Sequence, residues 1–158
     1  MSTHTANPVE FCRQLAALRG SSNHYTTLYM PAAQQPAAWA VLALRHELNE
    51  VITRIAEPSV ALARLDWWQA ELQAAAQGKA QHPIAQALSL HVLNHPGHDA
   101  LLDEMLHGAH ARLHPARIEQ ASDFALMSYR EDIAAWLILT DIGGQAGRSE
   151  RDFAHALG

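Results

Sequence analysis

The chain has 158 residues, of which 49% are hydrophobic and 17% charged, so it is suited to one folded domain over residues 1–158 and is not disordered. Its 30 alanines and 20 leucines against 5 valines and 7 isoleucines favour helices and exclude a β-sandwich or barrel. A formal net charge of -5 with a single lysine, Lys79, excludes a dense phosphate-neutralising surface, so we expect no nucleic-acid partner.

The cellular setting is indicated by what the sequence lacks. The one cysteine, Cys12, cannot form an intrachain disulfide, and in its amphipathic helix we expect it to be a buried, inert thiol. Residues 1–5 lack the basic and apolar regions of a signal peptide, and the longest apolar run, Ile133–Leu139, is far shorter than a bilayer requires. We therefore expect a cytoplasmic protein without a transmembrane segment, whose contact with a membrane would be peripheral, at its inner face.

Proline and glycine divide the chain into segments with helical periodicity. The first predicted helix begins after the N-cap Asn7 and ends near Gly20, and a connector containing Pro31 leads to the second, over residues 36–57. Further helices are predicted, in chain order, over residues 58–78, 83–95, 99–113, 123–143 and from residue 149. We expect an all-α bundle of about seven helices, without a sheet.

The helix predicted over residues 36–57 has two different faces. Val41, Leu48 and Ile52 recur at helical spacing and form a core stripe. The opposite face is apolar at its start and polar at its end, and comprises Trp39, Leu42, Ala43, His46, Asn49, Glu50 and Thr53. Because a helix buried on both sides can line a cavity, we expect the first three of these residues to be cavity lining.

Four stretches of the sequence form a recognisable pattern: Tyr25–Pro31, Ala40–Leu48, Ala63–Leu72 and His82–Ala85. The most specific part combines Arg-Leu-x-Trp-Trp in the third stretch with His-Pro-Ile in the fourth. In order and spacing these stretches resemble the N-terminal part of the squalene/phytoene synthase family. The resemblance covers nearly all of this chain and about the first half to three-fifths of a typical member. It implies an isoprenoid-synthase-like helical bundle that is incomplete relative to the family.

The resemblance also implies a reaction, in which two prenyl diphosphates are joined head to head with Mg²⁺ held by two Asp-rich helical motifs. The first motif, Asp-Asp-x-x-Asp, falls on residues 49–53, where Glu50 is the single carboxylate and hence the single metal candidate. The second motif would lie beyond Gly158. The candidates for a diphosphate or metal face are Ser21, Ser22, Arg45, His46, Asn49, Glu50, Thr53 and Arg64.

Loss of the paired aspartates indicates a protein related to head-to-head prenyltransferases of isoprenoid metabolism that does not catalyse their reaction by itself. Two alternatives stay open. One is a non-catalytic interaction or assembly-factor protein, because the stretch Arg45–Leu48 resembles a family branch that includes a respiratory complex I assembly factor. The other is a prenyl- or lipid-binding protein that takes a prenyl diphosphate or another apolar ligand. The apolar faces of an incomplete bundle lead us to expect a homo-oligomer or a partner protein.

Several candidate residues also have purely structural interpretations. Trp67 and Trp68 are typical of core and interface packing. Arg64 can pair with Asp66 or Glu71 instead of an anion. The histidines form two sets, His91, His95, His98 and His107, His110, His114. The second set follows the i, i+3, i+7 spacing of one helix face, so a transition metal could bind two of its imidazoles adventitiously.

Overall fold

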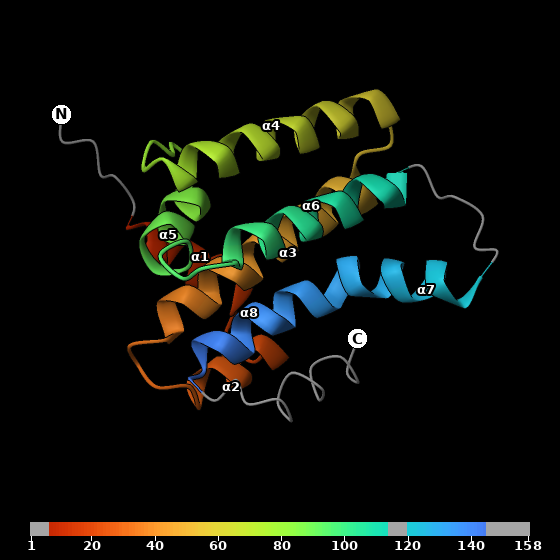
Figure 1. Cartoon of the computed structure of the whole chain (residues 1–158). Coiled ribbons are helices and arrows are strands. Elements are labelled where there is room, and N and C mark those ends of the chain that lie inside the picture. Colours follow the sequence, from red (N-terminus) through yellow and green to blue (C-terminus); the bar gives the residue numbers. More distant parts are fainter. Residues whose placement is uncertain (1–6, 114–119, 145–158) are drawn as a thin grey trace, which may run out of the picture.

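The structure, a computed structural model, describes residues 7–113 and 120–144. Over these ranges the chain has eight α-helices, one π-helical turn and no strand (Figure 1). In chain order they are α1 (Pro8–Ala16), α2 (Ser22–Leu28), α3 (Gln35–Arg54), α4 (Pro58–Ala76), α5 (Pro83–His91), α6 (His98–Leu113), α7 (Ala121–Ser128), η1 (Tyr129–Ile133) and α8 (Ala134–Ile142). The all-α fold predicted from the composition is confirmed.

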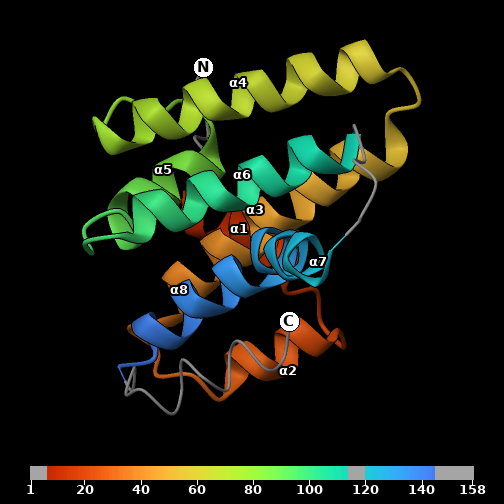
Figure 2. The ribbon, with the colours of Figure 1, turned by 45° about the vertical axis from the view of Figure 1, so that its right-hand side comes forward.

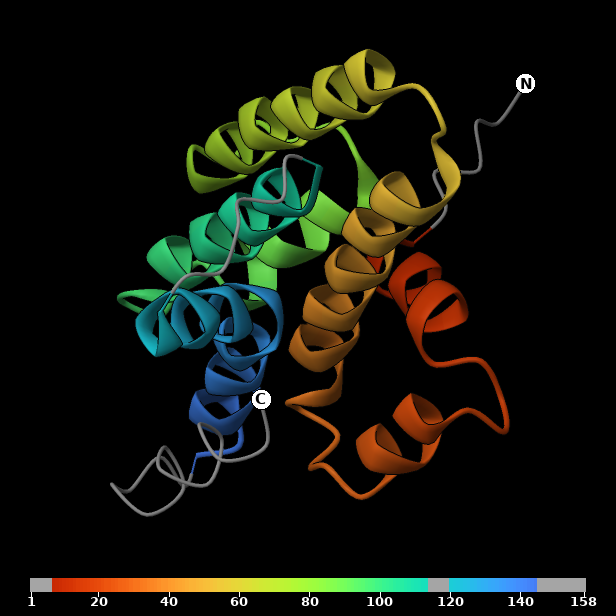
Figure 3. The same ribbon diagram turned by 90° about the vertical axis from the view of Figure 1, so that its right-hand side faces the viewer.

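The longest helix, α3, occupies the centre of the bundle. It packs against α1, α2, α4, α5, α6 and α8, and Figure 3 shows it between α1 and the pair formed by α6 and α8. Nine of its residues are buried, including the four alanines Ala37, Ala38, Ala40 and Ala43. Because small side chains let neighbouring helices approach closely, α3 can be contacted from several directions at once.

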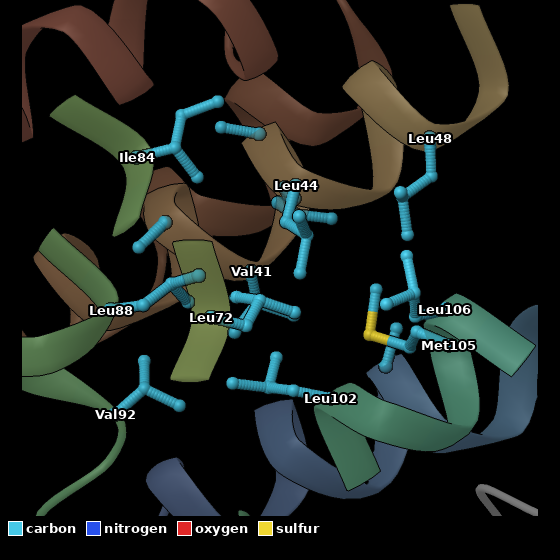
Figure 4. Close-up of a cluster of buried hydrophobic side chains, with 14 of the residues drawn as sticks. Val41, Leu44, Leu48, Leu72, Ile84, Leu88, Val92, Leu102, Met105 and Leu106 are labelled. Atoms are coloured by element: carbon cyan, nitrogen blue, oxygen red, sulfur yellow. The ribbon is translucent and has the colours of Figure 1, made fainter. Parts of the chain in front are cut away.

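The hydrophobic core lies where α3, α5 and α6 meet. Figure 4 shows Leu44 and Leu48 of α3 gathered in one cluster with Leu88 of α5 and with Met105 and Leu106 of α6. All five side chains are buried. Full burial of one such side chain contributes about 1.5–3 kcal/mol, so this cluster fixes α6 against the central helix.

A second layer is formed by α4, which runs beside α6 in both Figure 1 and Figure 2. A buried carboxylate ties α4 to the start of α5. Oε1 of Glu71 accepts hydrogen bonds from the backbone N–H groups of Gln81 and His82, each at 2.6 Å. At the other end of α5, the Ser89 hydroxyl donates to the carbonyl of Ala75 at 2.7 Å. These contacts satisfy backbone groups that a helix end leaves without an intrahelical partner.

Several helices begin or end at the capping and glycine residues that the sequence predicted. The side chain of Asn7 accepts a hydrogen bond from the N–H of Val9 at 3.0 Å, as an N-cap should. After α4, Gly78 has φ of +70°, and the N–H of Lys79 donates to the carbonyl of Ala74 at 2.8 Å. Glycine adopts this left-handed conformation without a Cβ clash, which is why it ends the helix.

The structure differs from the predicted elements in two places, and a third predicted element is not described. The first helix ends at Ala16 and not near Gly20, because Ser21 caps a separate short helix, α2, that the periodicity did not predict. The single helix predicted over residues 123–143 is α7, η1 and α8 in continuous succession. The helix expected from residue 149 lies outside the described residues.

The π-helical turn lies where the chain crosses α6. A Cβ added to Gly108 of α6 would stand 2.9 Å from the backbone C and O atoms of Arg130 in η1, so the two backbones touch here. Beside this crossing, Nε of Arg130 binds Oε2 of Glu104 at 2.8 Å. A π-turn changes the direction of the side chains that follow it, so η1 sets the face that α8 presents to α3 and α6.

Large hydrophobic side chains also lie on the surface. Four of them, Leu18, Tyr25, Leu28 and Tyr29, are each more than half exposed and lie between α1 and the end of α2. We call these four residues the α2 surface. Of the helices in the described part of the chain, none is both long and apolar enough to cross a membrane.

Candidate ligand-binding site

A cavity of about 320 Å³ lies between α2, α3 and α6. It is lined by Asn23, Leu42, Arg45, His46, Leu48, Asn49, Ile52, Met105, Ala109 and Arg112. The apolar residues of the lining are mostly buried, whereas His46, Asn49 and Arg112 are exposed. The accessible part of the lining is therefore more polar than apolar, and the volume of the cavity falls in the range of small-molecule sites.

Helix α3 supplies most of the lining. Leu42, Arg45 and Asn49 follow one another at three- and four-residue steps, which places them on one side of the helix. Leu42 lies near the middle of α3 and Asn49 near its end, so the face changes from apolar to polar toward the mouth of the cavity. Of the face that the sequence predicted, Leu42, His46 and Asn49 are part of this lining.

Helix α6 supplies the opposite wall. Met105, Ala109 and Arg112 are again spaced by four and three residues, so they share one face of α6. Nη1 of Arg112 donates a hydrogen bond to Oδ1 of Asn49 at 3.3 Å, and this bond joins the two walls. Asn23 of α2 is held nearby because its amide donates to the carbonyl of Ala16 at 3.0 Å.

The charged side chains that line the cavity are basic. Two arginines, Arg45 and Arg112, line it together with His46, and no carboxylate is part of its lining among the described residues. From residue 11 to residue 46 the sequence contains neither aspartate nor glutamate. The cavity is therefore lined by basic side chains although the whole chain has a formal net charge of -5.

The structure brings four of the predicted site residues together: Leu42, Arg45, His46 and Asn49 all line the cavity. The other two residues of predicted cavity lining have different surroundings. Ala43 is fully buried in the core. Nε1 of Trp39 donates to the hydroxyl of Thr27 at 3.2 Å, which links α3 to α2.

Glu50, Thr53 and Arg64 have other contacts. Oε2 of Glu50 forms an ion pair with Nε of Arg54 at 2.7 Å, one turn along α3. The hydroxyl of Thr53 donates to the carbonyl of Asn49 at 2.8 Å. The guanidinium carbon of Arg64 lies 4.5 Å from the centre of a ring of Trp67, so its contact is a cation–π interaction.

The two serines lie at the beginning of α2. The hydroxyl of Ser21 accepts a hydrogen bond from the N–H of His24 at 3.1 Å and so acts as the N-cap of this helix. Ser22 is the first residue of α2 and is exposed. Both serines belong to the N-terminal end of α2, and neither lines the cavity.

The residues at this site do not fit a magnesium cluster. Mg²⁺ prefers carboxylate oxygens and gives up its water reluctantly, so it needs paired negative charge. The cavity is instead lined by the guanidinium groups of Arg45 and Arg112, and no carboxylate is among its described lining residues. The carboxylate of Glu50 is bound to Arg54. Among the side chains that the structure describes, no group of three or more His, Cys, Asp or Glu residues is placed to hold a metal ion.

The predicted histidine sets have separate contacts. Nδ1 of His98, which is buried, lies 3.1 Å from the carbonyl of Val92. Nε2 of His110 lies 3.3 Å from Oδ1 of Asp66, so this histidine links α6 to α4. His114 lies outside the described residues.

Sequence reasoning missed two polar residues of the cavity, Asn23 and Arg112. Arg112 ends the stripe that Met105 and Ala109 begin on α6, and this position was a usable signal. Asn23 lies on α2, a helix that was not predicted, so no pattern connected it to the site.

The fold and the cavity define a class of protein: an all-α, isoprenoid-synthase-like bundle with a cavity against its central helix. A comparison with protein families matches residues 17–158 to the family described as squalene/phytoene synthase. The chain therefore belongs to the squalene/phytoene synthase family, as its motifs predicted. A search of curated proteins found no match.

Proposed function

We propose that this chain is a non-catalytic member of the squalene/phytoene synthase family, which does not by itself join prenyl diphosphates head to head. The observation that carries the proposal is the Arg112–Asn49 hydrogen bond at the rim of the cavity. Asn49 stands where the resemblance places the first aspartate of the metal-binding motif. An amide that accepts a hydrogen bond from a guanidinium group supplies no negative charge for Mg²⁺.

The physical argument concerns the leaving group. Ionisation of a prenyl diphosphate separates a carbocation from a diphosphate, and in the enzymes Mg²⁺ ions stabilise the developing negative charge. Two arginines can bind a diphosphate, but they do not replace a metal cluster held by several carboxylates. The chain is therefore expected to bind without turnover.

Purified protein incubated with farnesyl or geranylgeranyl diphosphate and Mg²⁺ tests the proposal. The expected result is no pyrophosphate release and no C30 or C40 hydrocarbon, with an active family member assayed in parallel as the positive control. Release of pyrophosphate together with either product would show that the proposal is wrong.

A second candidate function is a protein-interaction role, of the kind that assembly factors perform. The α2 surface supports it, because Leu18, Tyr25, Leu28 and Tyr29 expose apolar area within twelve residues of one another. The occupant that we propose is a second copy of this chain. We further propose a cytoplasmic setting for this chain.

Light scattering over a range of protein concentrations tests this second function. We expect a dimer or larger species that dissociates in the double variant Leu28→Ser, Tyr29→Ser. The variant Leu90→Ser is the matched control, because Leu90 is also more than half exposed but lies on α5. A compact monomer at high concentration contradicts self-association, and co-sedimentation with anionic vesicles would then identify the surface as membrane-binding.

A further inference from the structure

We infer that protonation of His82 acts as a pH-sensitive switch at the start of α5: when the imidazole ring gains a proton, the first turn of the helix opens while its end stays packed. The switch lies outside the cavity, because neither His82 nor the aromatic rings around it are among the lining residues. The inference therefore goes beyond the proposed function and does not depend on it.

The hydrogen bond that caps α5 requires the neutral form of His82. Nδ1 of the ring accepts this bond from the backbone N–H of Ile84 at 3.2 Å, so the proton of the neutral ring is on Nε2. An imidazolium ring has a proton on both nitrogens and accepts no hydrogen bond. Protonation therefore removes the cap from the N–H of Ile84, a residue whose side chain is buried in the core (Figure 4).

The position of His82 adds a second penalty for the charged ring. His82 is the N-cap of α5, a helix of nine residues. The N–H groups at a helix N-terminus carry partial positive charge, so a cation at this position is repelled. Both effects favour the open turn once the ring is protonated, because opening separates the charge from the helix end and returns the ring to water.

The surroundings of the ring keep it neutral in the closed turn. Helix α5 packs against α1, α3 and α4, and burial among them lowers the pKa of His82. Of the charged groups that act on the ring, Glu47 of α3 and Glu71 of α4 raise this pKa and Arg64 of α4 lowers it, whereas α1 contributes the ring of Phe11. The open turn therefore gains on the closed turn as the pH falls below ~6.5.

Two anchors confine the opening to the first turn. Before α5, Oε1 of Glu71 accepts hydrogen bonds from the backbone N–H groups of Gln81 and His82. Near the other end, the hydroxyl of Ser89 donates to the carbonyl of Ala75. None of these bonds involves the imidazole ring, so they persist when the ring is protonated. The first turn of α5 lies between the two anchors and opens without the rest of the helix.

Nuclear magnetic resonance of the full chain tests the inference in two measurements. Long-range ¹⁵N correlation spectra at pH 7.5 should show the proton of His82 on Nε2. Hydrogen exchange, corrected for its intrinsic dependence on pH, should show the protection of the Ile84 amide falling by roughly tenfold between pH 7.5 and pH 5, as expected for the loss of one N-cap.

A low concentration of urea distinguishes local opening from global unfolding. Local opening exposes little surface, so the exchange of the Ile84 amide should not depend on urea. The reference is the amide of Val92, which donates to the carbonyl of Leu88 at 2.9 Å at the end of α5. We expect its exchange to be slower and to depend on urea.

The variant His82→Asn removes the proton site and keeps a side-chain acceptor for the N–H of Ile84. In this variant the protection of Ile84 should no longer change with pH. The matched control is His107→Asn at an exposed position of α6, which should behave as the unmodified chain does.

Two single-charge variants keep the test decisive if His82→Asn fails to fold. Glu47→Gln removes a charge that stabilises the protonated ring in the closed turn, so the loss of protection at pH 5 should become larger. Arg64→Gln removes a charge that opposes the protonated ring, so the loss should become smaller. Arg64 is exposed, and its replacement disturbs no core contact.

A loss of protection at Ile84 that His82→Asn abolishes, and that the two charge variants change in opposite directions, supports the inference. The inference is overturned if the His82 proton is on Nδ1, if Ile84 keeps its protection at pH 5, or if His82→Asn loses protection as the unmodified chain does. It is also overturned if the exchange of Ile84 depends on urea as strongly as that of Val92. The assay for prenyl transfer decides the proposed function separately.

Discussion

His82 is enclosed by aromatic rings where α1, α4 and α5 meet. Its ring centre lies 4.9 Å from that of Trp68, 5.7 Å from that of Trp67 and 5.8 Å from that of Phe11. Its Nδ1 also accepts a hydrogen bond from the N–H of Ile84 at 3.2 Å, which makes it the N-cap of α5. Burial lowers the pKa of this imidazole, since the charged form loses solvation.

This lowered pKa predicts a pH dependence of stability. The unfolded chain binds the proton more tightly than the folded chain, so the contribution of His82 is complete above pH ~6.5 and is lost as the pH falls through the folded pKa. Urea unfolding between pH 7.5 and pH 5 should therefore give a falling free energy. His82→Asn, which keeps an N-cap side chain, should flatten the slope, whereas the exposed-site variant His107→Asn should not. An unchanged slope in His82→Asn would contradict this assignment.

The reactivity of the Cys12 thiol is a second property of a single residue that can be predicted. It is fully buried, and burial raises the pKa of its thiol to about 12. Because the thiolate is the reactive form, we expect no reaction with a thiol-specific disulfide reagent in the folded chain and one equivalent of reaction after unfolding in guanidinium. Rapid stoichiometric labelling of the folded chain is the result that this burial does not allow.

At the scale of elements, the contact between α6 and η1 depends on a missing side chain. Gly108→Ala places a Cβ 2.9 Å from backbone atoms of Arg130, which cannot move as a flexible side chain can. We expect a net loss of about 1–3 kcal/mol in the free energy of unfolding, even though alanine is the better helix former. The measurement is denaturant unfolding.

A reversed substitution in the same helix calibrates this result. Ala111 is exposed on α6, so Ala111→Gly should cost about 1 kcal/mol through helix propensity alone. Together the two variants separate the contribution of helix propensity to the free energy of unfolding from that of the close approach between the α6 and η1 backbones. A stabilised Gly108→Ala chain would mean that η1 and α6 can separate without loss.

The helices could be predicted from the sequence where a local signal marks their ends. Asn7 with Pro8, Gly78, and His82 with Pro83 act within their own turns, so their positions were found to within a few residues. The short helix α2 was missed because seven residues are too few to establish a periodicity. The π-turn at Tyr129–Ile133 was missed because its cause, the crossing with Gly108, is a tertiary contact.

At the scale of the whole molecule, the cavity was predictable only in part. One wall follows from the periodicity of α3, so Leu42 and Asn49 could be placed on it from the sequence. The other wall depends on how α6 packs against α3, and no local pattern specifies that packing. The hydrogen bond from Arg112 to Asn49 joins residues 63 positions apart and so could not be anticipated.

We expect the helices of the bundle to differ in their free energies of opening. Nine residues of α3 are buried, whereas none of α7 is. Native-state hydrogen exchange is therefore expected to be slowest in α3, at the free energy of global unfolding, and much faster in α7, through local opening. Mass spectrometry of exchanged peptides measures both, and equal protection of the two helices would contradict this ordering.

The central position of α3 has a thermodynamic consequence for anything bound against it. A ligand in the cavity contacts the helix that we expect to open last. The favourable free energy of binding is therefore lost only when the whole chain unfolds. At a concentration one hundred times its dissociation constant, such a ligand would add about 2.7 kcal/mol to the global free energy of unfolding. Ligand binding in one small cavity would therefore raise the melting temperature of the entire bundle.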